Sequence, residues 1–197
     1  ILQIPVEEYI KYEAGETDIP ISVLFKTADE FGVEFTALVT GKEPTLADGT
    51  RIYLEEGEKL TLEQMLYAML LNSANDAAVA VAEHIAGSEK NFVKMMNQFA
   101  GEVGAKDTHY VNPHGLHDDN HYSSAYDLAL LARYAMQNPT FEKIVATKKR
   151  VIPWAGHEWN RLLINKNKFI ANPDLYPGAD GIKNGFTTPA GYCLMAS

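Results

Sequence analysis

Residues 62–86 read LEQMLYAMLLNSANDAAVAVAEHIA, and most of the predicted architecture follows from them. At the start of this stretch, Thr61 and Gln64 have the spacing of a capping box, in which each side chain accepts a hydrogen bond from the other residue's backbone N–H. The pattern predicts a helix over Leu62–Leu71. Its apolar face is expected to contain four side chains at helical spacing, namely Leu62, Met65, Leu66 and Met69.

The polar run NSAND at residues 72–76 interrupts this apolar pattern. A second helix is predicted over Ala77–Ala86, with Asn75 or Asp76 as its cap and Gly87 at its end. Because its residues are unusually small and apolar, we expect this helix to be buried.

Further capping patterns predict three more helices. Ser88 can cap a helix that continues to about Val103 and ends at Gly104. Ser124 can cap another over residues 125–137, which the following Asn-Pro pair ends. Pro139 itself suits the first turn of a further short helix.

The remaining segments have the composition of strands. From Thr147 onward, strands are predicted within residues 150–153, 181–188 and 191–196, while residues 21–27 and 33–39 read as a β-hairpin. The order of strands, helices and strands predicts an α+β fold in which a helix cluster packs on an antiparallel sheet.

Composition excludes several classes of protein. The 197 residues are 46% hydrophobic, which excludes disorder, and no apolar run reaches the length of a membrane span. A net charge of −9 argues against a nucleic-acid partner, and the single cysteine excludes an intrachain disulfide. Residues 1–60 hold 13 acidic and 5 basic side chains, a net −8, against −1 for residues 61–197. We therefore expect a separate acidic segment, containing the hairpin, over residues 1–48.

Two short motifs have functional groups suited to chemistry. In Ser73-Ala-Asn75, a hydroxyl and a carboxamide two residues apart suit proton relay and amide recognition, although helix capping explains them as well. In Lys183-Asn-Gly185, at the start of a predicted edge strand, the ammonium can hold a carboxylate and the glycine lets a ligand approach the backbone. A turn with a solvated lysine is the alternative.

Taken together, the tripeptides S-x-N and K-x-G in this order resemble the motifs of the penicillin-binding proteins and serine β-lactamases. The sequence around them resembles the low-molecular-mass D-alanyl-D-alanine carboxypeptidases, and this resemblance covers residues 49–197. It is carried by five stretches: LEEGEKLT at 54–61, LLNSANDAA at 70–78, NPHGL at 112–116, SAYDLALLA at 124–132 and AGYC at 190–193.

The resemblance implies a β-lactamase/transpeptidase-like fold, incomplete or rebuilt at the N-terminus, with a carboxypeptidase-like domain over residues 49–197. It also implies acyl transfer from peptidoglycan stem peptides ending in D-Ala-D-Ala, without a cofactor, and binding of β-lactams if a nucleophile is present. Such a protein would be exported and act in the bacterial cell envelope, in the periplasm or on the outer face of the cytoplasmic membrane, with its signal outside this chain.

The resemblance also assigns roles to individual residues. Ser73 would relay a proton to the leaving amine, and Asn75 would hold the substrate amide. Lys183 would pair with the terminal carboxylate or polarise Ser73. The substrate-binding residues on the same strand would be Asn184, Gly185 and Thr187.

The nucleophile motif S-x-x-K of this family is absent. The pair that comes closest is Ser22 and Lys26, four residues apart, and it lies in the predicted hairpin. A catalytically inactive protein that binds peptidoglycan or another partner is therefore the alternative function. A second departure is Asn184, where the family usually has threonine or serine; the loss of that hydroxyl would weaken carboxylate binding.

Residues 114–121 imitate a metal site. Their side chains include ligand types that suit zinc: His114, His117, Asp118, Asp119 and His121. However, this run matches a structural loop of the family, so no metal is expected.

Trp154 and Trp159 flank a Gly-His-Glu loop. We expect this loop near the rim of the cleft. The two indoles are interpreted as packing or peptide-contact residues and not as a cofactor site.

Overall fold

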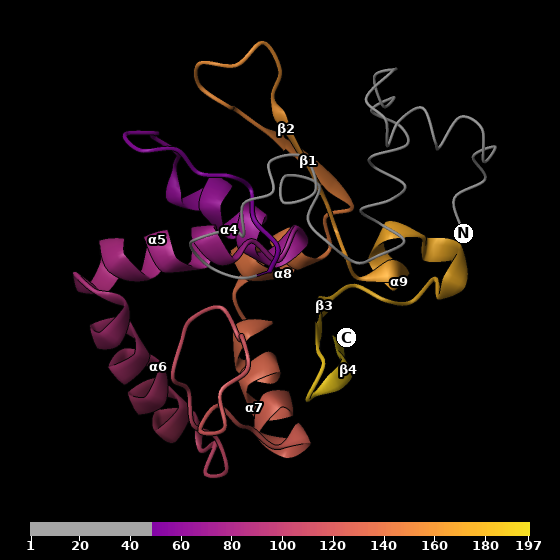
Figure 1. The fold of residues 1–197 in the computed structure, drawn as a ribbon. Helices are drawn as coiled ribbons and strands as arrows, with labels where there is room; N and C mark the ends of the chain where they lie inside the picture. Colours follow the sequence, from indigo (N-terminus) through magenta and orange to yellow (C-terminus); the bar gives the residue numbers. More distant parts are fainter. Residues whose placement is uncertain (1–48) are drawn as a thin grey trace, which may run out of the picture. The chain divides into compact units, whose positions relative to one another are not determined.

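The computed structural model describes residues 49–197, and the predicted hairpin at 21–39 lies outside them. Figure 1 shows helices α4 to α8 followed by two strand pairs and the short helix α9. In chain order the elements are α4 (Leu62–Leu71), α5 (Asn75–Ala86), α6 (Glu89–Val103), α7 (Ala125–Ala135), α8 (Pro139–Val145), β1 (Lys149–Ile152), β2 (Arg161–Ile164), α9 (Lys168–Ala171), the 3₁₀ turn η1 (Pro173–Leu175), β3 (Ile182–Thr187) and β4 (Gly191–Ala196).

Helix α4 begins as predicted. Thr61 Oγ1 accepts from the Gln64 backbone N–H at 3.2 Å, and Gln64 Oε1 accepts from the Thr61 N–H at 2.8 Å, so the capping box is confirmed. Its buried face differs from the predicted stripe, because Leu62 is 50% exposed. The core-facing side chains are Met65, Tyr67, Ala68 and Leu71.

Helix α5 begins at Asn75, two residues before the predicted start. Its N-cap is Ala74, which has no side-chain hydrogen bond, so the prediction that Asn75 or Asp76 caps the helix is wrong. Inside the first turn, the carboxylate of Asp76 accepts the Ala77 N–H at 2.9 Å and also the backbone N–H groups of Ile52 and Leu54 at 3.2 and 3.1 Å. This acid therefore ties the extended segment before α4 to the first turn of α5.

Helices α6 to α8 agree with their capping patterns. Ser88 and Ser124 each accept a backbone N–H at the start of α6 and α7, and Gly104 ends α6 in the left-handed region at φ 93°. Helix α7 ends at Ala135, two residues before the predicted end. The reason is that Asn138 precedes a proline and caps α8, so the chain must leave the helix earlier.

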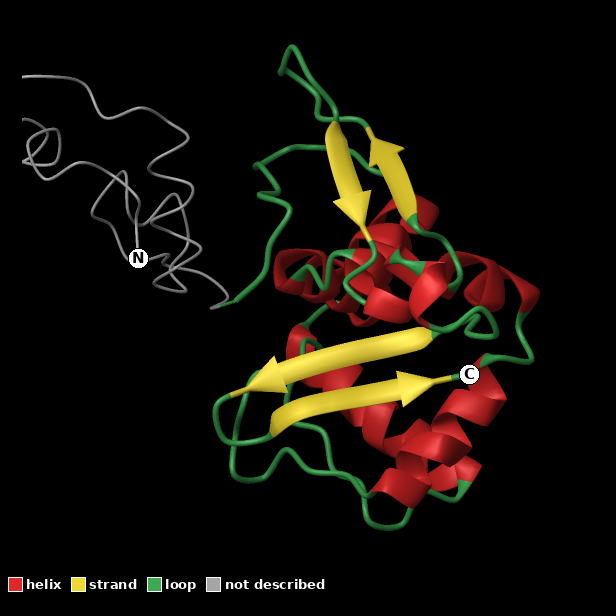
Figure 2. Cartoon of the chain, turned by 90° about the vertical axis from the view of Figure 1, so that its right-hand side faces the viewer, coloured by secondary structure: helices red, strands yellow, loops and turns green. Residues whose placement is uncertain are grey.

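The four strands form two antiparallel pairs within residues 49–197. Strand β1 pairs with β2, and β3 pairs with β4 so that Lys183 lies opposite Met195 and Gly185 opposite Cys193. Figure 2 shows β3 and β4 in front of the helices, and both strands contact α7 or α8. The helices pack beside antiparallel strands, so the predicted α+β class is confirmed.

The core lies between α4, α8 and the β1–β2 pair. It contains fully buried aliphatic side chains, among them Leu71, Ile144, Ile152 and Leu163. Burial of these side chains is the main stabilising contribution, about 2 kcal/mol each. Within residues 49–197 no helix combines the length and apolarity needed to cross a membrane.

Candidate active site

Ser73 lies at the junction between α4 and α5. Its backbone has φ 59°, in the left-handed region, which costs an L-residue roughly 1–2 kcal/mol. Two flanking backbone hydrogen bonds hold this conformation: Ala74 donates to Ala68 O at 3.2 Å and Asn75 donates to Thr50 O at 2.8 Å. The half-buried hydroxyl is thus presented on a strained turn that its surroundings fix.

Lys183, at the second position of β3, reaches this hydroxyl. Its Nζ donates to Ser73 Oγ at 3.0 Å and to its neighbour's carbonyl, Asn184 O, at 2.6 Å. Burial and the nearby Lys166 charge lower the pKa of Lys183 from 10.5 to about 8. At neutral pH the group therefore still carries its proton, yet it releases that proton far more readily than an exposed lysine.

A second ammonium at this site, that of Lys166, was not predicted from the sequence. Its Nζ donates to Thr50 Oγ1 at 2.7 Å, and its backbone N–H donates to Leu71 O at 3.0 Å, at the end of α4. The repeating pattern Asn-Lys-Asn-Lys reads as a solvated loop. This segment differs from a solvated loop because Asn165 and Asn167 are buried, and no local sequence pattern predicts that burial.

Those two asparagines connect the strand pairs to the site. Asn165 Nδ2 donates to the carbonyls of Val145 and Thr147 at 2.9 and 3.1 Å, and Asn167 Nδ2 donates to Gly181 O at 3.1 Å. Both side chains are at least 97% buried. Since Gly181 directly precedes β3, Asn167 helps to set where that strand begins, and with it the position of Lys183.

Asn75 is adjacent to the site but buried, with 7% of its surface exposed. A Cβ atom on Gly49 would lie 2.6 Å from Asn75 Nδ2, so the carboxamide packs against the glycine backbone. Gly49 also has φ 105°, and no other residue would fit there without strain.

The other predicted substrate-binding residues follow Lys183 along β3. A Cβ on Gly185 would meet no atom within 4 Å, so the space above this backbone is open. Asn184 and Thr187 are half-buried, and Thr187 Oγ1 accepts the Ala190 N–H at 3.2 Å in the turn to β4. Ser22 and Lys26, the pair that comes closest to the nucleophile motif, lie outside residues 49–197.

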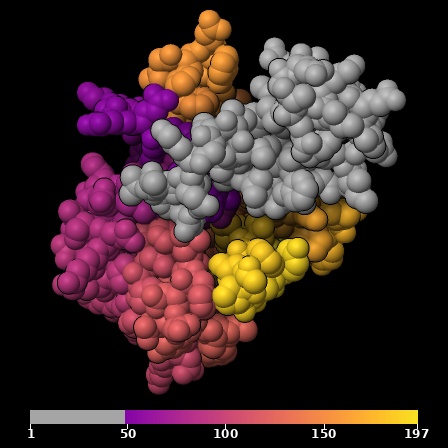
Figure 3. Space-filling model, in the orientation of Figure 1, coloured from indigo at the N-terminus to yellow at the C-terminus, as the bar shows by residue number. Residues whose placement is uncertain are grey.

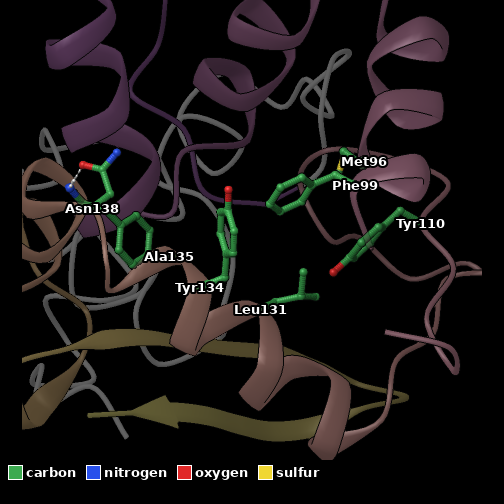
Figure 4. Close-up of a pocket in the computed structure, with 8 residues that line it drawn as sticks. Met96, Phe99, Tyr110, Leu131, Tyr134, Ala135 and Asn138 are labelled. Atoms are coloured by element: carbon green, nitrogen blue, oxygen red, sulfur yellow. Dashed lines mark hydrogen bonds between the residues drawn. The ribbon is translucent and has the colours of Figure 1, made fainter. Parts of the chain in front are cut away.

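An apolar hollow of about 430 Å³ lies between α6 and α7 (Figure 4). Its lining contains none of the predicted site residues, so it is separate from the Ser73–Lys183 pair. The residues around it are Met96, Phe99, Tyr110, Leu131, Tyr134, Ala135, Asn138 and Phe141.

The histidine run forms loop contacts. The Nδ1 atoms of His114 and His121 accept from the backbone N–H groups of Leu116 and Val111, and burial lowers the pKa of both imidazoles. Among the described residues, no three His, Cys, Asp or Glu side chains gather into a group able to hold a metal ion.

The fold and the serine–lysine contact define a class. In this structure the junction of two helices presents a serine hydroxyl to a lysine on a β-strand. The fold around this pair is similar to that of the penicillin-binding proteins. Penicillin-binding protein 6B from Escherichia coli superimposes with a TM-score of 0.68 at 33% identity, over 79% of this chain and 47% of that one. A serine-to-alanine mutant of the Streptomyces K15 DD-transpeptidase gives a TM-score of 0.69 at 30% identity, over 75% and 60%.

The chain belongs to the D-alanyl-D-alanine carboxypeptidase family Peptidase_S11, whose sequence profile matches residues 22–197. The carboxypeptidase DacF of Bacillus subtilis is 41% identical over 158 residues, which are 80% of this chain and 40% of DacF. DacA of Escherichia coli is 34% identical over 173 residues, or 88% and 41%. The chain thus spans about two fifths of the length of these relatives.

Proposed function

We propose that this chain supplies the Ser73–Lys183 half of a serine-type D-Ala-D-Ala carboxypeptidase site that acts on peptidoglycan stem peptides. The observation that carries the proposal is the 3.0 Å contact from Lys183 Nζ to Ser73 Oγ. It joins two groups 110 positions apart in the chain, in the order that the family's motifs have.

The proposed step is acyl transfer. A nucleophilic hydroxyl attacks the carbonyl before the terminal D-alanine, the C–N bond breaks, and the leaving amine must gain a proton. Ser73 gives its hydroxyl proton to that nitrogen and is reprotonated by Lys183, whose pKa of about 8 suits the exchange. The proton that the attacking hydroxyl loses restores Lys183 to its charged form. Water then releases the acyl group as a free carboxylic acid.

Two lysine ammonium groups near Ser73 can bind the terminal carboxylate of the substrate. The ammonium groups of Lys183 and Lys166 are close enough for one to lower the pKa of the other. Because two like charges repel at this range, an anion placed between them relieves the repulsion. The open backbone above Gly185 leaves room beside β3 for the terminal residues of the peptide.

The nucleophile of this step is unassigned, since no serine of the chain has a lysine three residues later, and Ser22 with Lys26 is only the pair that comes closest. Since stem peptides occur outside the cytoplasmic membrane, the proposed place of action is the bacterial cell envelope. β-Lactams, which resemble the D-Ala-D-Ala end, are the proposed competing ligands.

The test combines labelling with turnover. The folded chain is incubated with a fluorescent penicillin, and release of D-alanine from an acyl-D-Ala-D-Ala peptide is measured separately. A labelled band, with turnover that Ser73→Ala and Lys183→Ala reduce, supports the proposal, and Ser22→Ala then shows whether that serine carries the label. Lys106→Ala, which removes an exposed lysine, is the matched control and should change neither signal.

The inactive binding protein predicts another outcome. It requires saturable binding of the dipeptide end, weakened by Lys183→Ala, with no labelled band and no D-alanine release. A flat titration together with no label would overturn both functions.

A further inference from the structure

The loop between β1 and β2 contains a ladder of stacked side chains. The guanidinium carbon of Arg161 lies 4.5 Å from the centroid of the Trp154 ring. The His157 ring lies 4.0 Å from Trp154 at an interplanar angle of 31°, and Trp159 follows at 6.4 Å from His157 and 43°. The ladder thus runs from a buried arginine to an indole that is 63% exposed.

The buried end of this ladder is firmly anchored. Arg161 donates to both carboxylate oxygens of Glu58, at 2.5 and 2.9 Å, and both side chains are 5% exposed. It also donates to the carbonyls of Ile52 and Tyr53 at 2.6 and 2.8 Å. The hydrogen bonds from Arg161 lower the pKa of Glu58. Together with the two carbonyl acceptors, they fix the orientation of the guanidinium group.

The middle of the ladder is fixed by Glu55. Its Oε1 accepts from Trp154 Nε1 at 3.2 Å and lies 2.6 Å from His157 Nε2. In Figure 3 the indigo segment that contains Glu55 and the orange loop that contains the two tryptophans lie beside each other at the surface. Trp159, at the outer end, makes no hydrogen bond within residues 49–197.

A large exposed indole beside an anchored cluster of side chains is a surface on which a ligand can stack. The C–H faces of a pyranose ring stack on indole faces, and carboxylates such as Glu55 accept hydrogen bonds from sugar hydroxyls. Since the supporting side chains are already ordered, little conformational entropy is lost on binding.

The spacing along the chain between the loop and Lys166 matches the length of a stem peptide. Strand β2 leads from Arg161 toward Lys166, five residues apart, which at about 3.3 Å per residue is roughly 17 Å. An extended stem peptide of about five residues spans about the same length. A peptide whose terminal carboxylate lies at Lys183 can therefore place its glycan at this loop.

We propose that residues 153–160, with Trp159 as the contact residue, bind the glycan strand that carries the stem peptide. The proposal rests on the function proposed above, because that function supplies the substrate and its direction. It adds a second subsite, for an N-acetylhexosamine chain, to the site for the peptide end.

Two probes separate the subsites. A peptide-free N-acetylhexosamine oligosaccharide and a sugar-free acyl-D-Ala-D-Ala peptide are each titrated against the chain, with NMR shifts or intrinsic fluorescence as readout. We expect Trp159→Ala to weaken oligosaccharide binding at least about tenfold, Trp159→Phe to weaken it less, and neither to change peptide binding. Tyr126→Ala, which removes an aromatic side chain that is 72% exposed on α7, is the control and should leave both affinities unchanged.

The outcomes distinguish the two proposals. If the oligosaccharide binds and the peptide does not, the glycan subsite stands and the proposed function fails. If the wild-type chain does not bind the oligosaccharide, or Trp159→Ala binds it as well as the wild type, the glycan subsite is wrong. Equal melting temperatures for wild type and variants exclude unfolding as the cause of a loss.

Discussion

Lys183 gives the sharpest test of the site, because its charge can be removed by pH alone. If its ammonium holds the terminal carboxylate of a peptide, binding requires the protonated form. With a pKa of about 8, roughly one molecule in ten carries the charge at pH 9, so the affinity should fall about tenfold from its value at pH 7. An ordinary lysine, with a pKa of 10.5, would lose only a few per cent of its charge over the same range.

The assay is calorimetric titration of an acyl-D-Ala-D-Ala peptide between pH 6.5 and 9.5. The same peptide with an amidated C-terminus is the matched control, since it has no carboxylate and its binding should not follow this titration. Lys166→Met removes the like charge, so the pKa of Lys183 should rise and the decline should begin at higher pH.

An affinity that stays constant up to pH 9.5 would refute this reasoning, because Lys183 would then not supply the charge that binds the carboxylate. A second measurement checks the pKa independently of any ligand. The unfolded chain keeps the ordinary value, so between about pH 8 and 10.5 it binds more protons than the folded chain. Stability should therefore rise with pH across this window, by at most about 1.4 kcal/mol per pH unit, and Lys183→Met should abolish the rise.

Three further substitutions test the structure around the site. Asp76→Ala leaves three backbone N–H groups without their acceptor, those of Ile52, Leu54 and Ala77, so urea unfolding should show a loss of about 2–3 kcal/mol; a loss below about 0.5 would mean that the segment before α4 is held otherwise. Glu58→Gln leaves the buried Arg161 charge uncompensated and should cost about 3–5 kcal/mol in the same measurement, whereas a neutral result would show the pair to be solvated. Ser73→Gly removes the strain of a left-handed residue and should be about 1 kcal/mol more stable than Ser73→Ala, with turnover reduced in both; equal stabilities would contradict the strain.

Local patterns predicted most helix boundaries, because the groups that start and end a helix lie within a few residues of each other. Thr61, Ser88 and Ser124 act at the helix starts where the sequence indicated them. The prediction failed at α5, since Asp76 binds backbone groups 22 and 24 positions earlier in the chain. A capping pattern contains no information about such a distant competitor.

Strand β2 was missed for a related reason. Its sequence, Arg-Leu-Leu-Ile, lacks an alternation of polar and apolar residues, and its first side chain is a buried charge. Arginine at a core position is explained only by Glu58, 103 positions earlier. The meeting of Ser73 and Lys183 was expected from the resemblance to a family, while Lys166 joins the site through long-range contacts that no local pattern encodes.

The junction that bears Ser73 is tethered by three separate parts of the chain. Lys166 binds Leu71, Thr50 binds Asn75, and the last turn of α4 binds Ala74. Because these hydrogen bonds come from three segments, we expect the junction to keep one conformation. Under the proposed function, we therefore expect a peptide end to meet the Ser73 hydroxyl already in place, so that no conformational entropy is lost in ordering this junction on binding.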